Sequence, residues 1–263
     1  MRDRVGNAVL DVLDRVDGAS RVPRLGGMAR ANGVVIVSER FWAFAGVDGG
    51  LREGRMPCAP RALRRVPLVR GLLRLAASLS PLFRRTGVAP PRERRLLAAA
   101  VVAPLALVFA PAWLGLVLGL AVTAGLVAWL LRGRTLFLHG AEHRAIAAVE
   151  ERRLRSTWQG HASPSRFSRR CGTNFAALLL PVATLGEHLS PLPTAFTPVA
   201  VTVLSLAVTM ELWQLVQGSS RGVAKAFLLP GLALQRVTTR EPTLAETRVA
   251  LRAVASVLQR ELA

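Results

Sequence analysis

The feature that most constrains the fold is a run of 36 residues without a charged side chain, from Leu96 to Leu131. A helix needs about 20 apolar residues to cross the hydrocarbon core of a bilayer, so this run is nearly twice that length. Pro111 interrupts it near the middle, which predicts a hairpin of two short spanning helices. A single core helix of a soluble protein would not tolerate this length. We therefore expect a membrane protein.

A second apolar stretch predicts another hairpin. It runs from Phe175 to about Leu185, pauses at residues 186–191, and resumes from about Phe196 to Leu215. Basic residues flank the ends of both runs, whereas the tips are nearly uncharged, so the positive-inside rule places the ends in the cytoplasm. We expect a mostly α-helical, polytopic protein of the cell membrane. It has about four short spanning helices in two hairpins, and both termini are cytoplasmic.

The remaining segments predict small cytoplasmic elements. Leu25 to about Gly54 is typical of a small β element, because the strand-like segments Val34–Val37 and Phe41–Ala45 are followed by an Asp-Gly-Gly turn signal. Residues 67–82 mix Leu with Arg and favour an amphipathic helix in the membrane interface, or else an ordinary surface helix. Thr243 and Glu246 have the spacing of a capping box ahead of a C-terminal helix.

These segments divide the chain into three consecutive regions. The first is a cytoplasmic N-terminal region with the amphipathic and β elements, the second holds the two hairpins with a polar loop between them, and the third is a C-terminal segment and helix. Their bounds are 1–93, 94–225 and 226–263.

Composition narrows the class of partner. The formal charge is +19 and the mean hydropathy is +0.36. All basic residues except Lys225 are Arg, which is typical of a GC-rich genome and weakens the argument for nucleic acid. Aromatic and basic residues are also not interleaved as a stacking platform for nucleic acid requires.

The two cysteines are too few for a disulfide framework. Acidic residues near the N-terminus argue against a signal peptide.

A short motif carries the chemistry. His139 and His143 are four residues apart and therefore lie on one face of a helix, close enough to bind one metal ion. With Glu142 they have the H-x-x-E-H spacing of inverted zinc peptidases, in which the Glu is a ligand or a general base. The alternative is the end of an amphipathic helix whose polar residues face water.

Several segments in this order and spacing resemble the YqhQ-like family of bacterial membrane proteins, a domain of unknown function (1385). The resemblance extends from about Leu25 to the C-terminal helix and implies a metal-dependent membrane protein, without indicating a substrate. The segments that carry it are Gly26-Gly27, Leu138–Arg144, Arg170–Thr173, Glu211 and Pro230–Pro242.

This chain departs from the family pattern at two positions. Asn32 stands where the family usually has Glu, and Ser168 stands where it usually has His. Either this copy has lost part of a metal site and is a degenerate member, or Cys171 completes the site.

A catalytic zinc site needs three protein ligands and one open position. His139 and His143 supply two, and Cys171 is our first choice for the third because a thiolate binds zinc well. Glu142, His161 and Glu211 are further candidates for this position. The alternative for Cys171 is a small buried residue at a helix start.

The resemblance and the residues together indicate two candidate bases. Glu142 adjoins the histidines, and Glu211 lies in an otherwise apolar segment, where an ionisable side chain is costly and often functional. The alternative for Glu211 is a hydrogen bond between helices.

A polar cluster follows Pro230-Gly231. Its arginines and hydroxyls could bind a phosphate group, or they form a capped loop, which we prefer slightly. The cluster contains Arg236, Thr238, Thr239, Arg240 and Glu241.

Together these patterns predict an integral membrane enzyme that depends on a divalent metal ion such as zinc and is hydrolytic. The alternative is a non-catalytic scaffold or lipid-binding protein. Membrane lipid is the expected partner, a homo-oligomer is compatible with the sequence, and nucleic acid is not expected.

Overall fold

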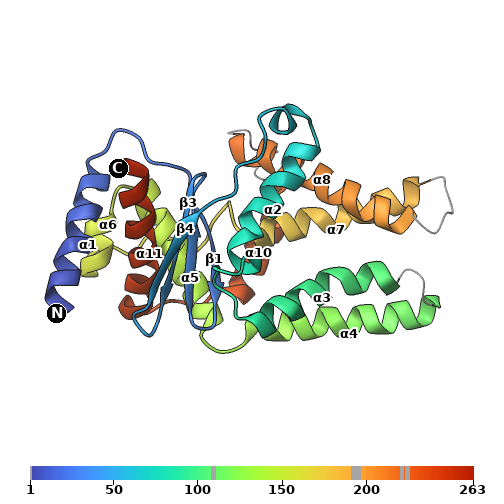
Figure 1. Ribbon diagram of the computed structural model, residues 1–263, viewed down its shortest axis with the longest axis horizontal. Helices are drawn as coiled ribbons and strands as arrows, with labels where there is room; N and C mark the ends of the chain where they lie inside the picture. The colour runs from blue at the N-terminus through green and yellow to red at the C-terminus, as the bar shows by residue number, and fades with distance from the viewer. Residues whose placement is uncertain (1, 108–110, 191–196, 220–221, 223–225) are drawn as a thin grey trace. The chain divides into compact units, whose positions relative to one another are not determined.

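The computed structural model describes residues 2–107, 111–190, 197–219, 222 and 226–263. The chain divides into two compact units (Figure 1), each assembled from separated parts of the sequence. Unit 1 contains Met1–Pro57, Leu130–Cys171 and Leu232–Ala263. Unit 2 contains Cys58–Trp129 and Gly172–Gly231.

Unit 1 contains a four-stranded antiparallel sheet in which each strand pairs with the next along the chain. The strands are β1 (Gly26–Arg30), β2 (Gly33–Val37), β3 (Phe41–Gly46) and β4 (Leu51–Arg55). The predicted β element is therefore confirmed. Its Asp-Gly-Gly signal forms the β3–β4 turn, where Gly49 has a φ of 93° that favours glycine.

Two helices of unit 1 pack on this sheet, and two more pack on those helices. They are α1 (Arg2–Asp17), α5 (Thr135–Glu150), α6 (Leu154–Gln159) and α11 (Leu244–Leu262). The helix α11 packs on β2, β3 and α5, whereas α5 also packs on β1. Alternate residues of β2 and β3 supply the sheet side of the core, as the period of two in a strand requires. They are Val34, Ile36, Ala43 and Ala45, all fully buried.

The C-terminal helix is fixed at both ends. Thr243 and Glu246 form the predicted capping box at its start. Near its end, Glu261 accepts hydrogen bonds from Ser38 at 2.5 Å and from Arg40 at 2.8 Å, next to the start of β3. These contacts hold α11 across the sheet, and α11 in turn supports α5.

Unit 2 is helical. It comprises η1 (Leu63–Arg65), α2 (Val69–Phe83), α3 (Pro91–Leu107), α4 (Ala112–Leu131), α7 (Gly172–Leu189) and α8 (Thr197–Gly218), and α10 (Leu229–Thr238) leads from it into unit 1. The helices α7 and α2 both pack on α8. The rings of Phe175 and Trp213 meet edge to face, with centroids 5.8 Å apart.

The expectation of a polytopic protein with four spanning helices is wrong. Among the described residues, one helix is long and apolar enough to cross a membrane, namely Thr197–Gln217 of α8. That finding rests on length and composition. The protein is mostly helical with a small antiparallel sheet, and the multi-pass topology drawn from the two apolar runs is not supported.

The prediction of four spanning helices fails because of the positions at which the helices begin and end. The 36-residue run is divided between α3 and α4, and α3 begins with Arg92, Glu93, Arg94 and Arg95, so that only Leu96–Leu107 of this helix is uncharged. Twelve residues are too few to span a bilayer. In the second run, α7 carries Asn174 near its start and Glu187 near its end. Many side chains of α4 lie outside the described residues.

Candidate metal centre

The His motif lies on α5, which is buried on nearly all sides between β1 and α11. Small residues permit this close packing. A Cβ atom at Gly140 would lie 2.1 Å from the carbonyl oxygen of Arg240, and Arg240 itself donates a backbone hydrogen bond to Leu136 at 3.0 Å. The segment that follows α10 therefore lies directly on the helix that carries the histidines.

Backbone carbonyls orient both imidazoles. Nδ1 of His139 is 2.8 Å from the oxygen of Thr238, and Nδ1 of His143 is 2.7 Å from the oxygen of Arg166. Because a carbonyl only accepts hydrogen bonds, each Nδ1 must carry the proton. In the neutral ring, each Nε2 atom then keeps a free lone pair.

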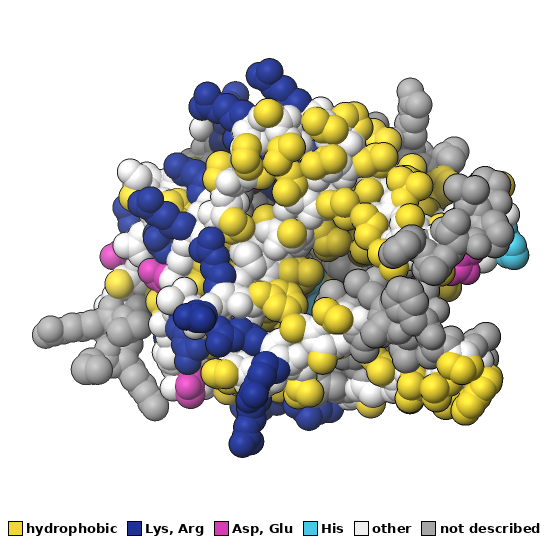
Figure 2. Space-filling view, turned by 45° about the vertical axis from the view of Figure 1, so that its right-hand side comes forward, with side chains coloured by type: hydrophobic (Ala, Val, Ile, Leu, Met, Phe, Trp, Pro, Cys, Tyr) yellow, Lys and Arg dark blue, Asp and Glu magenta, His cyan; other side chains and the backbone are white. Residues whose placement is uncertain are grey.

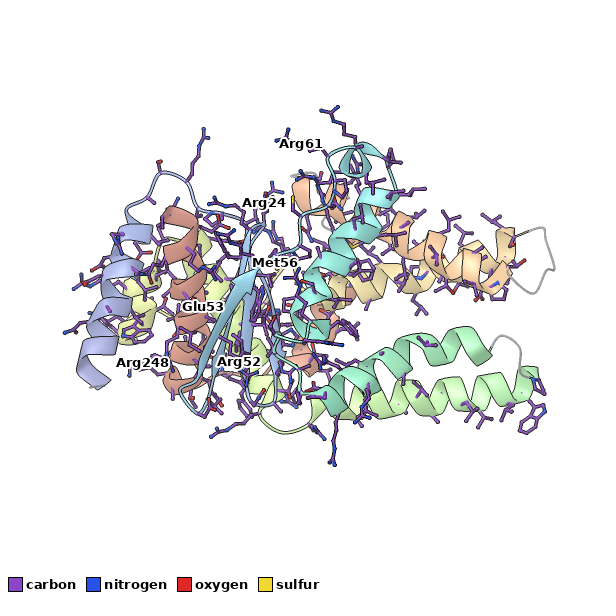
Figure 3. All side chains as sticks on the ribbon, viewed as in Figure 1. Arg24, Arg52, Glu53, Met56, Arg61 and Arg248 are labelled. Carbon is purple, nitrogen blue, oxygen red and sulfur yellow. The ribbon has the colours of Figure 1, made fainter. Side chains whose placement is uncertain are left out.

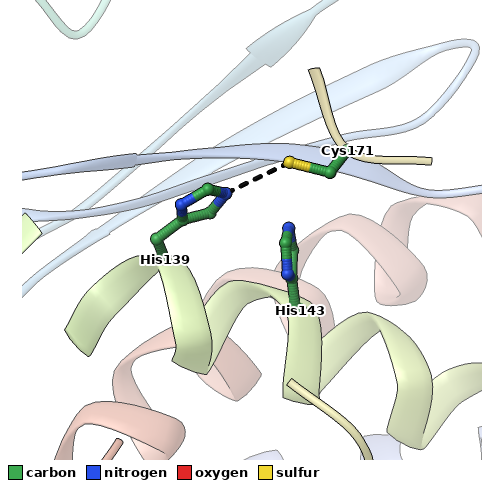
Figure 4. A group of neighbouring side chains, drawn as sticks. All are labelled: His139, His143 and Cys171. Carbon is green, nitrogen blue, oxygen red and sulfur yellow. Dashed lines mark hydrogen bonds between the residues drawn. The ribbon is translucent and has the colours of Figure 1, made fainter. Parts of the chain in front are cut away.

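The two Nε2 atoms and the Cys171 sulfur converge. Sγ of Cys171 is 3.3 Å from Nε2 of His139 (Figure 4). Ligand atoms of all three residues lie within 4.8 Å of one another. Tetrahedral zinc with ordinary bond lengths would hold them roughly 3.3–3.6 Å apart, so a closure of about 1 Å completes such a site.

The electrostatics favour neutral imidazoles. Burial lowers the pKa of His143 to about 3, and the neighbouring His139 adds to this effect. Burial also lowers the pKa of His139. Nε2 of His143 is buried and has no hydrogen-bond partner within the described structure. A buried lone pair without a donor is costly, and a metal ion would satisfy it.

The loop before α7 is fixed by side chains from distant segments. Gln235 both donates to and accepts from the backbone of Ser168, each at 2.8 Å. Arg166 donates to the oxygen of Thr239 at 2.9 Å. Cys171 follows this loop immediately and precedes the first residue of α7, where helix N–H groups favour a thiolate.

Glu142 has a different environment from the three ligands. Its side chain lies against β1, where a Cβ atom at Gly27 would come within 2.8 Å of its Cγ and Oε1 atoms. Burial raises its pKa to about 8, so that the carboxyl is mostly protonated at neutral pH. The cluster of ligand atoms found among the described residues contains His139, His143 and Cys171 without Glu142.

The other candidate ligands also lie outside this cluster. Glu211 belongs to unit 2, where its carboxylate accepts hydrogen bonds from Arg70 at 2.8 Å and from the backbone of Leu68 at 3.2 Å. His161 is exposed in the loop after α6. The assignment of Glu142 or Glu211 as a base stays a prediction.

The polar cluster at residues 236–241 supports α5. The hydroxyls of Thr238 and Thr239 donate to carbonyls one turn earlier in α10, at 3.1 and 2.6 Å. Glu241 forms ion pairs with Arg144 and Arg166. Arg236 and Arg240 are exposed, and a role for the cluster in binding phosphate stays a prediction.

The two positions that depart from the family pattern lie in different places. Ser168 is in the fixed loop three residues before Cys171. Asn32 is exposed in the turn between β1 and β2, where its Oδ1 accepts a long hydrogen bond from Arg30 at 3.5 Å. Of the two, only Ser168 is close in sequence to a ligand of the cluster.

Sequence reasoning missed the residues that hold the ligands in place. They are Gly140, Arg144, Arg166 and Gln235, each of which contacts a segment far away in the chain. A signal was present for three of them, because Gly140, Arg144 and Gln235 lie inside the motif segments that carry the family resemblance. Nothing in the sequence singled out Arg166.

The comparisons confirm the family resemblance. A family model described as a protein of unknown function (DUF1385) matches residues 106–260, more than half of the chain. The chain belongs to this family. The matched region includes the His motif, Cys171, Gln235 and most of α11. No curated protein and no solved structure matches the chain.

Proposed function

We propose that His139, His143 and Cys171 bind a divalent transition-metal ion of the zinc class, and that this ion serves a hydrolytic reaction at a membrane. The observation that carries the metal proposal is the pair of bonds from Nδ1 to backbone carbonyls. Histidines that bind a metal through one nitrogen almost always donate the other N–H in this way. The buried Nε2 atom of His143, which has no partner, supports the same assignment.

The ligand set favours an open site. Two imidazoles and one thiolate leave a fourth tetrahedral position for water or substrate, as in catalytic rather than structural zinc sites. The ion would act there as a Lewis acid that polarises a carbonyl or phosphoryl oxygen. Glu142 keeps its proton near neutral pH, so in this chain it is a candidate proton donor.

A shallow pocket continues along the same side of α5. Ile146, one helical turn after His143, lines it together with Leu25 and Val149. Arg24, Glu150 and Arg170 also line this pocket, and Arg170 forms an ion pair with Glu150 at 2.7 Å. A substrate with a small apolar part fits such a lining.

Membrane association rests on α8. Only 22% of the most apolar part of Thr197–Gln217 is buried, whereas a core helix of this length in a soluble protein is mostly buried. Burying exposed apolar side chains such as Leu204, Leu212 and Leu215 in lipid would remove them from water. We therefore place the metal centre in a protein anchored by this helix.

A non-catalytic scaffold is the second candidate function, and Ser168 favours it. If the family chemistry needs a His at this position, the present chain keeps the fixed backbone without the side chain. The metal would then join α5 to the loop before α7 as a structural ion.

Metal analysis of the purified full-length protein tests the binding proposal. We expect about one zinc or cobalt ion per chain, and a Co²⁺ form with the visible absorption of a tetrahedral thiolate complex. H139A/H143A should abolish binding, and C171S should lower affinity about 10- to 100-fold and remove the thiolate absorption. The matched control H161A/H188A changes two exposed histidines and should bind as the wild type does. Equal metal content in H139A/H143A and its control would refute the site.

Hydrolysis assays separate the enzyme from the scaffold. The zinc-loaded protein, reconstituted in lipid, is tested on p-nitrophenyl acetate and bis(p-nitrophenyl) phosphate. An enzyme should give turnover that disappears with a chelator and in H139A/H143A. A scaffold should give no turnover, while the thermal midpoint of unfolding still falls when metal is removed.

A further inference from the structure

The segment from Cys58 to Arg95 has an unusual charge balance. It contains ten arginines and a single acidic residue, Glu93. Several of these arginines are exposed, and Arg61 projects outward from the segment that leads into η1 (Figure 3). Such a concentration of one charge attracts a partner of opposite charge.

Exposed apolar side chains lie among these arginines. Leu63 and Val66 are 42% and 44% exposed, and they are separated by Arg64 and Arg65. Figure 2 shows hydrophobic side chains gathered on the visible face, with Lys and Arg side chains beside them. Alternating cationic and apolar groups on one short segment are typical of the interface between headgroups and acyl chains.

The helix α2 joins this segment to the candidate membrane helix. Arg70 forms a bidentate ion pair with Glu211, and Arg74 binds Gln214. Gly71 permits the approach, because a Cβ atom there would lie 2.9 Å from Cβ of Met210. The basic segment is thereby held against the last third of α8.

A strained turn sets the direction in which the segment leaves this contact. Leu68 has a φ of 66°, and Val69 donates to the oxygen of Pro67 at 2.8 Å, which defines a γ-turn with positive φ. The carboxylate of Glu211 accepts the N–H of Leu68. Such a turn is costly for a residue with a side chain, so Glu211 fixes a conformation that the segment would otherwise leave.

The contact with α2 lies toward one end of α8. Glu211 lies seven residues before the end of α8, or about 10 Å along the axis at 1.5 Å per residue. A helix of 22 residues is about 33 Å long, close to the thickness of the hydrocarbon core. In a bilayer that α8 spans, arginines at this depth extend toward the phosphates of the nearer leaflet, because long basic side chains keep their charged ends at the interface.

We propose that residues 61–66 and α2 form a docking surface for anionic phospholipids, in which the arginines bind lipid phosphates and Leu63 and Val66 enter the acyl boundary. This proposal rests on the membrane association proposed for α8 and does not depend on the metal. Nucleic acid fits the segment poorly, because Phe83 is its one aromatic residue and bases would lack a stacking platform.

Cys58 offers a natural position for a probe, since it is exposed and adjoins the basic residues, whereas Cys171 is buried. The full chain, labelled at Cys58 with an environment-sensitive nitrobenzoxadiazole dye, is placed in nanodiscs. One set contains phosphatidylcholine alone, and the other contains phosphatidylcholine with phosphatidylglycerol. We expect blue-shifted, brighter emission in the anionic discs, reversed by high salt because screening weakens phosphate contacts.

Substitutions distinguish the effect of the arginines in residues 61–66 from the effect of the net charge of the protein. R61Q/R64Q/R65Q should lower the ratio of docked to undocked protein roughly 100-fold in anionic discs, and R61K/R64K/R65K should keep most of it. L63S/V66S should weaken docking without changing its salt dependence. The control R15Q/R21Q/R153Q removes three exposed arginines from other parts of the chain and should leave the emission unchanged.

Two outcomes would overturn the proposal. One is identical emission in the two kinds of disc. The other is an equal effect of R61Q/R64Q/R65Q and R15Q/R21Q/R153Q, which would indicate net charge rather than a built surface. A shift caused by an RNA oligonucleotide in neutral discs, and not by phosphatidylglycerol, would assign the segment to nucleic acid instead. Metal content measured on the same samples shows whether the metal proposal fails independently.

Discussion

At the scale of single residues, the proton on Glu142 links packing to pH. Its side chain is 4% exposed and lies against the backbone of Gly27. The pKa of about 8 in the folded protein exceeds the ordinary value of 4.5, because burial disfavours the charged carboxylate. Folding therefore binds this proton more tightly. The resulting stability is fully present below about pH 4.5 and is lost as the pH rises toward 8.

Replacing Glu142 by Gln should remove this dependence in the metal-free protein. His143 acts in the opposite direction, since its lowered pKa of about 3 destabilises the fold only as the pH falls below about 6.5. The change in stability between pH 6.5 and 8 is therefore due to Glu142. The free energy of unfolding of the wild type should fall there by about 2 kcal/mol, at 1.36 kcal/mol per pKa unit.

Denaturant titrations with a chelator present, at several pH values, measure this change. E142Q should be nearly flat between pH 6.5 and 8. E151Q, which alters an exposed carboxylate at the end of α5, should keep the decline of the wild type. A decline of equal size in E142Q would show that another group carries the proton.

At the scale of elements, the centre depends on how closely the segment after α10 approaches α5. Gly140 faces the carbonyl of Arg240, which cannot move aside as a flexible side chain could. Two residues before Arg240, Thr238 orients the ring of His139. One glycine therefore couples the packing of two distant segments to the direction of a ligand lone pair.

G140A should separate these segments. We expect a destabilisation of roughly 1–3 kcal/mol from overpacking and a loss of metal affinity, because the carbonyl of Thr238 would no longer meet His139. The matched control is G172A, since no atom lies within 4 Å of a Cβ at this position beside Cys171. Thermal unfolding and Co²⁺ titration measure both effects. Unchanged Co²⁺ affinity in G140A would show that the carbonyl contact is dispensable.

The elements also show what the sequence could predict. The sheet was predictable because Val34–Val37 and Phe41–Ala45 are strand-like and are followed by a turn signal that needs positive φ. The spacing of His139 and His143 is local, and it correctly indicated a shared face. The burial of α5 was not predictable, because α11 covers it from about a hundred residues later.

At the scale of the whole molecule, local sequence patterns gave a wrong prediction of the architecture. Uninterrupted apolar runs predicted four spanning helices, but a run does not reveal where a helix begins, and α3 starts with charged residues. Cys171 was the preferred third ligand, and the structure brings it to the histidines. Its neighbours Arg166 and Gln235 were missed because their role appears only when three separated parts of the chain assemble into unit 1.

This discontinuous assembly has a consequence for biosynthesis. His139 is translated 99 residues before Thr238, the residue whose carbonyl orients it, and α11 follows later still. At 5–20 residues per second, the interval is roughly 5–20 s. Before that interval ends, the ribosome has synthesised both histidines and Cys171, but it has not yet added Thr238, whose carbonyl orients His139. The centre can therefore be completed only after Thr238 has left the ribosome, so metal loading must wait for a segment that is translated long after the histidines.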